Sequence, residues 1–117
     1  MSEEMKSPET EVKPMEYVDV VPTADIIEEK NGVRVVVDLP GVDASNLDID
    51  IKDRMMKVSG TSTMSRNNRA VKFCRSFQLS DQIDINAIKA KISDGVLTIS
   101  LPKSESAKVH KISVTGE

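Results

Sequence analysis

Several short segments of this chain alternate apolar residues with charged or polar ones, and turn-forming residues end each segment. The clearest is residues 47–52, which read Leu-Asp-Ile-Asp-Ile-Lys, and residues 33–39 and 96–101 follow a similar pattern before Pro40-Gly41 and Pro102. Successive side chains of a β-strand point to opposite faces, so a period of two predicts strands with one buried and one exposed face. No segment shows a helical period longer than one or two turns. The chain is therefore expected to fold from short strands.

Turn residues between these segments predict hairpins. Asn31-Gly32 follows residues 24–29, and because Asn and Gly both tolerate a positive φ, this pair predicts a tight turn. Ser93-Asp94-Gly95 separates the apolar positions of residues 88–92 from residues 96–101, which predicts a hairpin or the corner of a sheet.

A third hairpin can be tested for register. If Asn67-Asn68 is a two-residue turn, Arg66 lies opposite Arg69, and the apolar residues of both strands then share one face. The other expected pairs are Met64 with Val71, Gly60 with Arg75, Val58 with Phe77 and Met56 with Leu79. The alternative is a flexible loop over residues 61–70.

Seven or eight such strands predict an all-β fold, an immunoglobulin-like antiparallel β-sandwich, over residues 22–103. Residues 1–21 contain Pro8 and Pro14 among charged residues and are expected to form a flexible N-terminal arm. The apolar residues near the end of this arm could instead form a short strand or dock on a partner. Residues 104–117 are expected to form a C-terminal extension.

Composition limits the function. The 117 residues suffice for one domain, and a net charge of −3 with one Tyr, two Phe and no Trp does not provide the basic, aromatic surface of a nucleic-acid-binding protein. No run approaches the roughly 20 apolar residues of a membrane helix, and the acidic N-terminal residues lack the apolar stretch of a signal peptide. We therefore expect a cytoplasmic protein that binds neither nucleic acid nor membrane.

Residues for catalysis are scarce. His110 is the only histidine and Cys74 the only cysteine, and neither has the local partners of a nucleophile or of a metal site. Asp48 and Asp50 share one face of a predicted strand, where paired acids could catalyse but alternating charges on a solvated face are the simpler interpretation. We expect no enzyme activity, no catalytic residue, no cofactor and no metal. His110 is expected at the surface, or it tunes docking of the tail through its protonation.

The C-terminal extension carries a separate apolar signal. Ile112 and Val114 are separated by one polar residue, so in an extended chain they point the same way and could enter two adjacent pockets beside a sheet edge. The alternatives are that they form a last strand of their own domain or stay free.

Four motifs, in this order, resemble the small heat-shock proteins and their α-crystallin domain over about residues 22–114. They are Asp38-Leu39-Pro40-Gly41, the residues 73–79 (Phe-Cys-Arg-Ser-Phe-Gln-Leu), the run from Ala90 to Gly95-Val96-Leu97, and Ile112-Ser113-Val114. The resemblance implies an ATP-independent chaperone, a holdase that binds partly unfolded proteins and suppresses their aggregation as a dynamic homo-oligomer built from dimers. The alternative is a monomeric adaptor similar to CS-domain co-chaperones, which share the sandwich.

The resemblance also implies roles for particular residues. Ala90, Gly95, Val96 and Leu97 match the motif that closes the sandwich, and Arg75 matches an arginine near the dimer interface of animal members.

The tail of the family docks on a neighbouring subunit, and here the matching residues are Ile112 and Val114. The resemblance implies that the groove for the tail is lined by Leu47, Ile49, Ile51, Ile88, Ala90 and Ile92.

Overall fold

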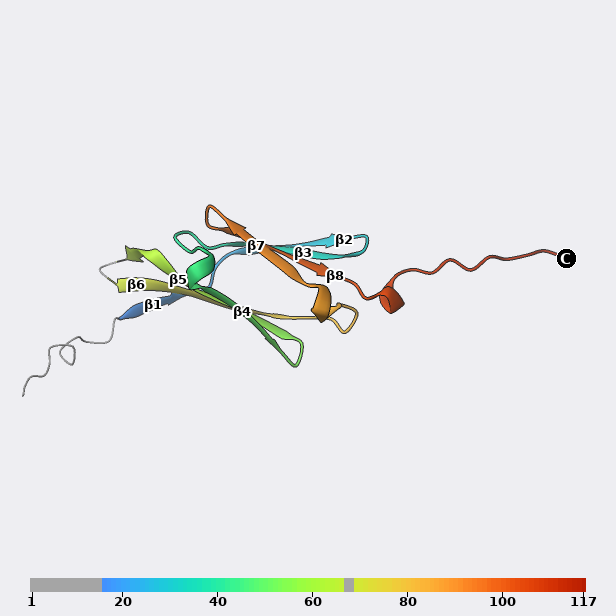
Figure 1. The fold of residues 1–117 in the computed structure, drawn as a ribbon, viewed down its shortest axis with the longest axis horizontal. Coiled ribbons are helices and arrows are strands. Elements are labelled where there is room, and N and C mark those ends of the chain that lie inside the picture. Colours follow the sequence, from blue (N-terminus) through green and yellow to red (C-terminus); the bar gives the residue numbers. More distant parts are fainter. Residues whose placement is uncertain (1–15, 67–68) are drawn as a thin grey trace, which may run out of the picture.

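Two four-stranded sheets packed face to face make up the body of the protein (Figure 1). The computed structural model describes residues 16–66 and 69–117. The first sheet has the order β1 (Tyr17–Val20), β6 (Arg69–Gln78), β5 (Met55–Arg66) and β4 (Leu47–Lys52). The second has the order β2 (Ala24–Glu29), β3 (Gly32–Asp38), β8 (Val96–Pro102) and β7 (Lys89–Ser93). The prediction of an all-β sandwich with seven or eight strands is confirmed.

Helical structure is limited to short 3-10 turns in the described residues. These are η1 (Ala44–Asn46), η2 (Ile85–Ala87) and η3 (Glu105–Ala107). Nowhere in residues 16–66 and 69–117 is a helix long and apolar enough to cross a bilayer.

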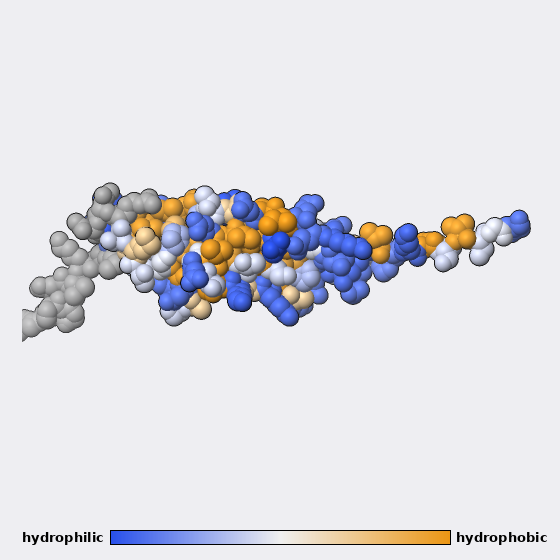
Figure 2. Space-filling model, turned by 90° about the horizontal axis from the view of Figure 1, so that it is seen from above, coloured by the Kyte–Doolittle hydropathy of each residue, from blue (hydrophilic) through white to orange (hydrophobic). Residues whose placement is uncertain are grey.

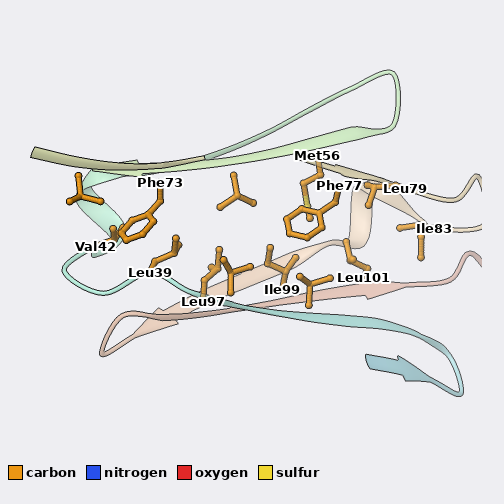
Figure 3. Close-up of a cluster of buried hydrophobic side chains, with 14 residues drawn as sticks. Leu39, Val42, Met56, Phe73, Phe77, Leu79, Ile83, Leu97, Ile99 and Leu101 are labelled. Carbon is orange, nitrogen blue, oxygen red and sulfur yellow. The ribbon is translucent and has the colours of Figure 1, made fainter. Parts of the chain in front are cut away.

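The core lies between the sheets, where the inward positions of the alternating segments meet (Figure 3). Val37 of β3, Met56 and Val58 of β5 and Ile99 of β8 have no measurable exposure. Alternation on facing strands therefore produces one continuous apolar layer, as expected for a sandwich. Two core residues lie outside the alternating segments, since Val42 in the loop after β3 and Ile83 in the polar connector after β6 are each only 4% exposed.

The predicted hairpin at Asn31-Gly32 is present, but the expected reason for it was wrong. Glu29 pairs with Gly32, so the two-residue loop is Lys30-Asn31, and neither Asn31 nor Gly32 has a positive φ. Gly32 is needed for a different reason, since a Cβ atom there would lie 2.5 Å from the carbonyl oxygen of Leu101 on β8. The glycine permits close approach of two strands.

Two turns do use positive φ. Asp94 and Gly95 have φ of 51° and 76° and join β7 to β8. This segment was expected to be a hairpin or the corner of a sheet, and the structure has the hairpin. Asp53 and Arg54, with φ of 52° and 61°, join β4 to β5, and the sequence analysis did not single them out. Both pairs have the sign of φ that a tight type I′ hairpin requires.

The predicted register of β5 against β6 is correct at the tip and wrong farther along. Arg66 lies opposite Arg69, as expected, but an irregularity between Thr61 and Ser65 shifts the pairs beyond it. The observed pairs are Gly60 with Phe73, Val58 with Arg75 and Met56 with Phe77. The shift is by two residues, since Val58 was expected opposite Phe77, and an even shift leaves every side chain on its predicted face. The expected turn residues Asn67-Asn68 lie outside the described residues.

Gly60 was expected opposite Arg75, and the same shift places it opposite Phe73. The space above Gly60 is occupied by Val42, since a Cβ atom on Gly60 would lie 2.9 Å from Cγ1 of Val42. Val42 is itself 4% exposed and belongs to the core. The glycine in β5 therefore makes room for the loop that follows β3.

β1 lies within the segment expected to form the flexible arm. It pairs with β6 in parallel, with Tyr17 opposite Ala70 and Val20 opposite Phe73. This is the short strand given above as the alternative, and its parallel pairing departs from the antiparallel pattern expected throughout. Residues 1–15 of the predicted arm lie outside the described residues.

Candidate functional site

The candidate site lies where β4 and β7 end their sheets. β1 and β2 are the edge strands at the other side, because only residues 21–23 join them. β4 and β7 are therefore edges of the same side of the sandwich, and in the described residues no further strand pairs with either. We define this β4/β7 margin by six residues, namely Leu47, Ile49, Ile51, Ile88, Ala90 and Ile92.

Aliphatic side chains line the β4/β7 margin. The three residues from β4, together with Ile88 and Ile92, are half-buried and pack against the core. Ala90 is paired with the fully buried Ile99 and so faces the same way, yet Ala90 is exposed. The small Ala90 side chain therefore marks an inward-facing position of β7 that the rest of the described chain leaves uncovered. The structure thus gathers all six predicted lining residues on one margin, and binding of a tail there stays a prediction.

The tail leaves the body after β8. The Lys103 amide donates to the Asn31 carbonyl at 2.8 Å and the Ser104 amide donates to the Gln82 carbonyl at 2.8 Å, which fixes the start of the tail. Beyond η3, residues 108–117 have no regular structure.

The aliphatic residues of this tail are exposed. Ile112 is 80% exposed and Val114 89% exposed, and Val109 is 92% exposed. The space-filling view shows these apolar groups on a narrow tail that extends away from the body (Figure 2). Ile112 and Val114 therefore do not form a last strand of their own domain, which was one of the alternatives for this segment.

The family motif of β7 and β8 has separable roles. Leu97 is a core residue, 1% exposed, whereas Val96 is 40% exposed. Gly95 accepts a hydrogen bond of 2.7 Å from the Leu39 amide through its carbonyl oxygen, and this contact joins the β7–β8 turn to the end of β3.

Arg75 makes contacts within its own chain. Its Nη1 atom donates a hydrogen bond of 3.0 Å to the Pro22 carbonyl oxygen, and its guanidinium group lies 5.2 Å from the ring centroid of Phe77. Arg75 therefore holds the crossing from β1 to β2 against β6. A role of Arg75 at a dimer interface stays a prediction.

Sequence reasoning missed Arg54. Its Nη1 atom donates to the carbonyl oxygens of Ser80 at 2.8 Å and of Ile83 at 3.0 Å. The Arg54 side chain thereby fixes the segment that follows β6 to the β4–β5 turn. In the sequence, the single apolar residue Ile83 is the only sign that this polar segment packs against the core.

An apolar hollow of about 180 Å³ was also missed. It lies between β2, β3 and the end of β6, and its lining includes Ile26, Val33, Phe77, Leu79, Ile83 and Leu101. Ile26 is 58% exposed at its rim, so this side of the sandwich presents apolar surface as well.

The described residues hold few groups for chemistry. Within residues 16–66 and 69–117, no three His, Cys, Asp or Glu side chains are grouped to hold a metal ion. Cys74 is a free, half-buried thiol on β6, and His110 is exposed on the tail. Asp48 and Asp50 are exposed on β4.

Two surface carboxyl groups have a lowered pKa with a local cause. The hydroxyl and amide groups of Ser45 donate to Asp43, and these bonds hold the pKa of Asp43 below its ordinary value. The Lys108 ammonium group, with Nζ 2.8 Å from Oε2 of Glu105, lowers the pKa of Glu105. Both pairs lie in 3-10 turns and stabilise these turns.

A two-sheet sandwich with open edge strands and a tail that carries an exposed aliphatic pair is an α-crystallin-type arrangement. The model of the Hsp20/alpha crystallin family matches residues 25–115. Small heat shock protein C2 of Rickettsia felis is 32% identical over 108 residues, which cover 84% of this chain and 70% of the relative. The 18 kDa antigen 1 of Mycobacterium avium is 38% identical over 93 residues, 71% of this chain and 63% of the relative.

Solved structures agree with the fold. Heat shock protein 16.0 from Schizosaccharomyces pombe has a TM-score of 0.64 at 26% identity, covering 83% of this chain and 77% of that one. A small heat-shock protein from Xylella fastidiosa has a TM-score of 0.65 at 28% identity, covering 83% and 98%. The chain therefore belongs to the Hsp20/α-crystallin family, the small heat-shock proteins, which are chaperones of the stress response and not enzymes. This confirms the resemblance.

Proposed function

We propose that this protein is an ATP-independent holdase that captures partly unfolded proteins and assembles into a dynamic oligomer built from dimers. The observation that carries this proposal is that one chain presents both an exposed aliphatic pair and an uncovered aliphatic margin, and that the pair does not bind to the margin of its own chain. Ile112 and Val114 are exposed on the tail, and the β4/β7 margin ends in two edge strands and is exposed at Ala90. The tail of one copy occupies the margin of another.

The energetics favour a reversible contact. Burying two aliphatic side chains contributes roughly 3 to 6 kcal/mol. Association costs at least about 4 kcal/mol in lost translational and rotational freedom. A single tail contact is therefore weak, and an oligomer made from many such contacts exchanges its subunits.

Subunit exchange provides the means of client capture. When a tail leaves, the aliphatic residues of the margin become available to an apolar segment of an unfolded protein. Such binding needs extended chain and apolar side chains but no particular sequence. The hollow between β2 and β6 adds further apolar surface of the same kind.

The first experiment measures assembly mass by size-exclusion chromatography with light scattering. The full chain is compared with the Ile112→Ala/Val114→Ala variant and with Val109→Ala as the matched control. Val109 is as exposed as the pair but has the opposite parity along an extended tail, so it faces away from a margin that the pair enters. We expect the double variant to dissociate to small species and the control to stay assembled. If the unsubstituted protein is strictly monomeric at micromolar concentration, this result would favour the adaptor alternative.

The second experiment tests the activity. Thermal aggregation of a model client is followed by turbidity without ATP, with the chain at a several-fold molar excess. We expect slower aggregation, and turbidity that does not change would reject the holdase proposal.

A further inference from the structure

The second sheet ends in two open edge strands of opposite charge. The exposed charged residues are carboxylates on β2 and lysines on β7, namely Asp25, Glu28, Glu29, Lys89 and Lys91. Of these, only Glu29 has an ion pair within residues 16–66 and 69–117, with Arg34 of the neighbouring β3. Like charges on adjacent strands destabilise pairing. Each edge is therefore poorly suited to pair with the same edge of a second copy.

One row of inward-facing residues crosses the second sheet and is uncovered at both ends. It runs from Ile26 on β2 through Val35 and Ile99 to Ala90 on β7. Val35 and Ile99 are buried, whereas Ile26 is 58% exposed and Ala90 is exposed as well. A second copy placed beside β7 in the same orientation, without stagger, brings its Ile26 opposite Ala90. A large side chain then lies beside a small one.

The adjacent row faces outward and ends in opposite charges. Its members, in order from β2 to β7, are Asp25, Val36, Thr98 and Lys91. The same unstaggered placement sets Asp25 of the second copy opposite Lys91. One register therefore provides both the size match of the inward row and the charge match of the outward row.

The rest of this register contains no pair of like charges. The remaining opposed residues, from the second copy's β2 side to β7, are Pro22 with Asp94, Ala24 with Ile92, Ile27 with Lys89, Glu28 with Ile88 and Lys30 with Asn86. Asp25 and Glu29 both lie diagonal to Lys89, at a distance that long side chains bridge. Glu28 is the one carboxylate that meets an apolar residue, and Lys103, which lines a hollow together with Glu28, places a positive charge near it.

The free main-chain groups of the two edges are in phase. The Asp38 amide donates to the Thr23 carbonyl oxygen at 3.1 Å, so the odd-numbered residues of β2 bond to β3 and the even-numbered ones, including Ile26, direct their N–H and C=O groups outward. On β7, the two-residue turn after Ser93 sets the alternation, so Ala90 also directs its groups outward. Opposed in this register, the two residues exchange two hydrogen bonds.

From these rows we propose that the β2 edge of one copy adds to the β7 edge of another as an antiparallel strand, so that the second sheet continues from copy to copy. Three antiparallel pairings separate β2 from β7 within one sheet, so the two strands run in opposite directions and copies placed side by side pair in this way. The opposite charges select the partner edge. The inference does not depend on the proposed tail contact, but both contacts cover Ala90, so one copy accepts only one of them at a time.

The contact is small. β2 has six residues and β7 has five. An interface of this size is transient, so we expect it to form well above micromolar concentration. Because each copy offers β2 and accepts at β7, the contact is heterologous and extends beyond a dimer.

Cysteine cross-linking of the full chain in a Cys74→Ser background tests the pairing. Positions 26 and 90 of one chain lie three strand spacings apart, about 14 Å, which exceeds the roughly 7 Å limit for a disulfide. Oxidation of Ile26→Cys/Ala90→Cys should therefore give a ladder of covalent multimers on a non-reducing gel. The matched control is Ile26→Cys/Lys91→Cys, whose second cysteine faces the other side of the sheet and should give no ladder. Covalent dimers from Ile26→Cys alone would show that β2 pairs with itself and would overturn the inference.

A charge-swap cycle tests the choice of edge independently. It uses the Ile112→Ala/Val114→Ala chain, which lacks the aliphatic pair of the tail, and measures by light scattering at low salt the concentration at which half of the chains are associated. We expect Asp25→Lys and Lys91→Asp each to raise this concentration by roughly 2- to 5-fold, and the combined variant to restore it. Asp48→Lys, on the outer face of the other sheet, is the control and should change nothing.

Two outcomes of this cycle would overturn the inference. One is a combined variant that is no better than the single ones. The other is an Ile112→Ala/Val114→Ala chain that stays monomeric at every concentration, a result that would leave the proposed tail contact standing. In about 1 M salt, where charges are screened beyond roughly 3 Å, the differences between the charge variants should vanish.

Discussion

The Ser62 hydroxyl group of β5 donates a hydrogen bond of 2.8 Å to the carbonyl oxygen of Pro40, in the loop after β3. The Ser62 hydroxyl oxygen in turn accepts a hydrogen bond of 3.0 Å from the Met64 amide. Next to it, the Thr63 amide donates to the Gly41 carbonyl oxygen at 2.8 Å. The irregular part of β5 is thereby fixed to a loop that leads out of the other sheet, and this contact explains why the register shifts there.

Gly41→Ala should destabilise the fold. Gly41 has a φ of 81°, and an added Cβ atom would overlap the Ser62 hydroxyl oxygen and lie 3.0 Å from Cγ of Met64. We expect a loss of about 1–3 kcal/mol in the free energy of unfolding, measured by denaturant titration. Gly116→Ala is the control, because nothing lies within 4 Å of its added atom.

Ser62→Ala should cost about 1–3 kcal/mol, because a buried hydroxyl group with two hydrogen bonds is lost. In Gly41→Ala/Ser62→Ala the loss should be smaller than the sum of the two, since the oxygen that the new Cβ atom meets is gone. Strict additivity would show that the two residues are not in contact.

Adjacent methionines should respond differently to truncation. Met56 is fully buried and Met55 is 41% exposed, although both lie in β5. Met56→Ala should lower the free energy of unfolding by about 2–5 kcal/mol because it leaves a cavity. Met55→Ala should cost less than about 1 kcal/mol. Equal losses would contradict the assignment of the inward face.

Arg75→Ala should destabilise each subunit, whether or not it is assembled. The variant loses the hydrogen bond to Pro22 and the packing on Phe77, with an expected cost of about 1–3 kcal/mol. Because these contacts are intramolecular, the loss should not depend on protein concentration, which thermal unfolding over a wide concentration range can check. A loss that shrinks on dilution would instead place Arg75 at an interface between copies.

The decrease in the free energy of unfolding at acid pH should depend in part on Asp43. The pKa of Asp43 lies below its ordinary value of 3.8, chiefly because Ser45 donates to it. A carboxyl group with a lowered pKa in the folded state stabilises the fold above its unfolded pKa, and this contribution is lost as the pH falls through the folded pKa. The difference in stability between the unchanged chain and Asp43→Asn should therefore shrink below about pH 4.

The Ser45→Ala variant provides the control for Asp43. Removing the hydroxyl donor should move the pKa of Asp43, measured by NMR, up toward 3.8. A pKa that stays where it was would show that the hydroxyl group is not its cause.

The strands and the core could be predicted because alternation acts locally. Residues 47–52 and 96–101 fold with the predicted faces inward, and Ile99 and Leu101 are core residues. The register of β5 could not be predicted beyond its tip, because the Ser62 contact to Pro40 joins residues far apart in the sequence. The assignment of side chains to the inward and outward faces of β5 stayed correct, because the register shift is an even number of residues.

The candidate site was predictable only in part. Ile112 and Val114 stand out by their spacing, but the residues of the β4/β7 margin came from a family resemblance. The exposure of Ala90 depends on where two sheet edges lie, which no local pattern encodes. Arg54 was missed because its two carbonyl partners come from a connector with only one apolar signal, Ile83.

The tail departs from the end of β8, whereas the β4/β7 margin runs along the side of the body (Figure 1). A contact between these two surfaces is heterologous, since each copy offers one half of it and accepts the other. Repeated, such contacts propagate from copy to copy and generate rings or filaments. If the proposed tail contact forms, a closed shell of defined size therefore needs a second, two-fold symmetric contact, and the tail would connect dimers rather than create them.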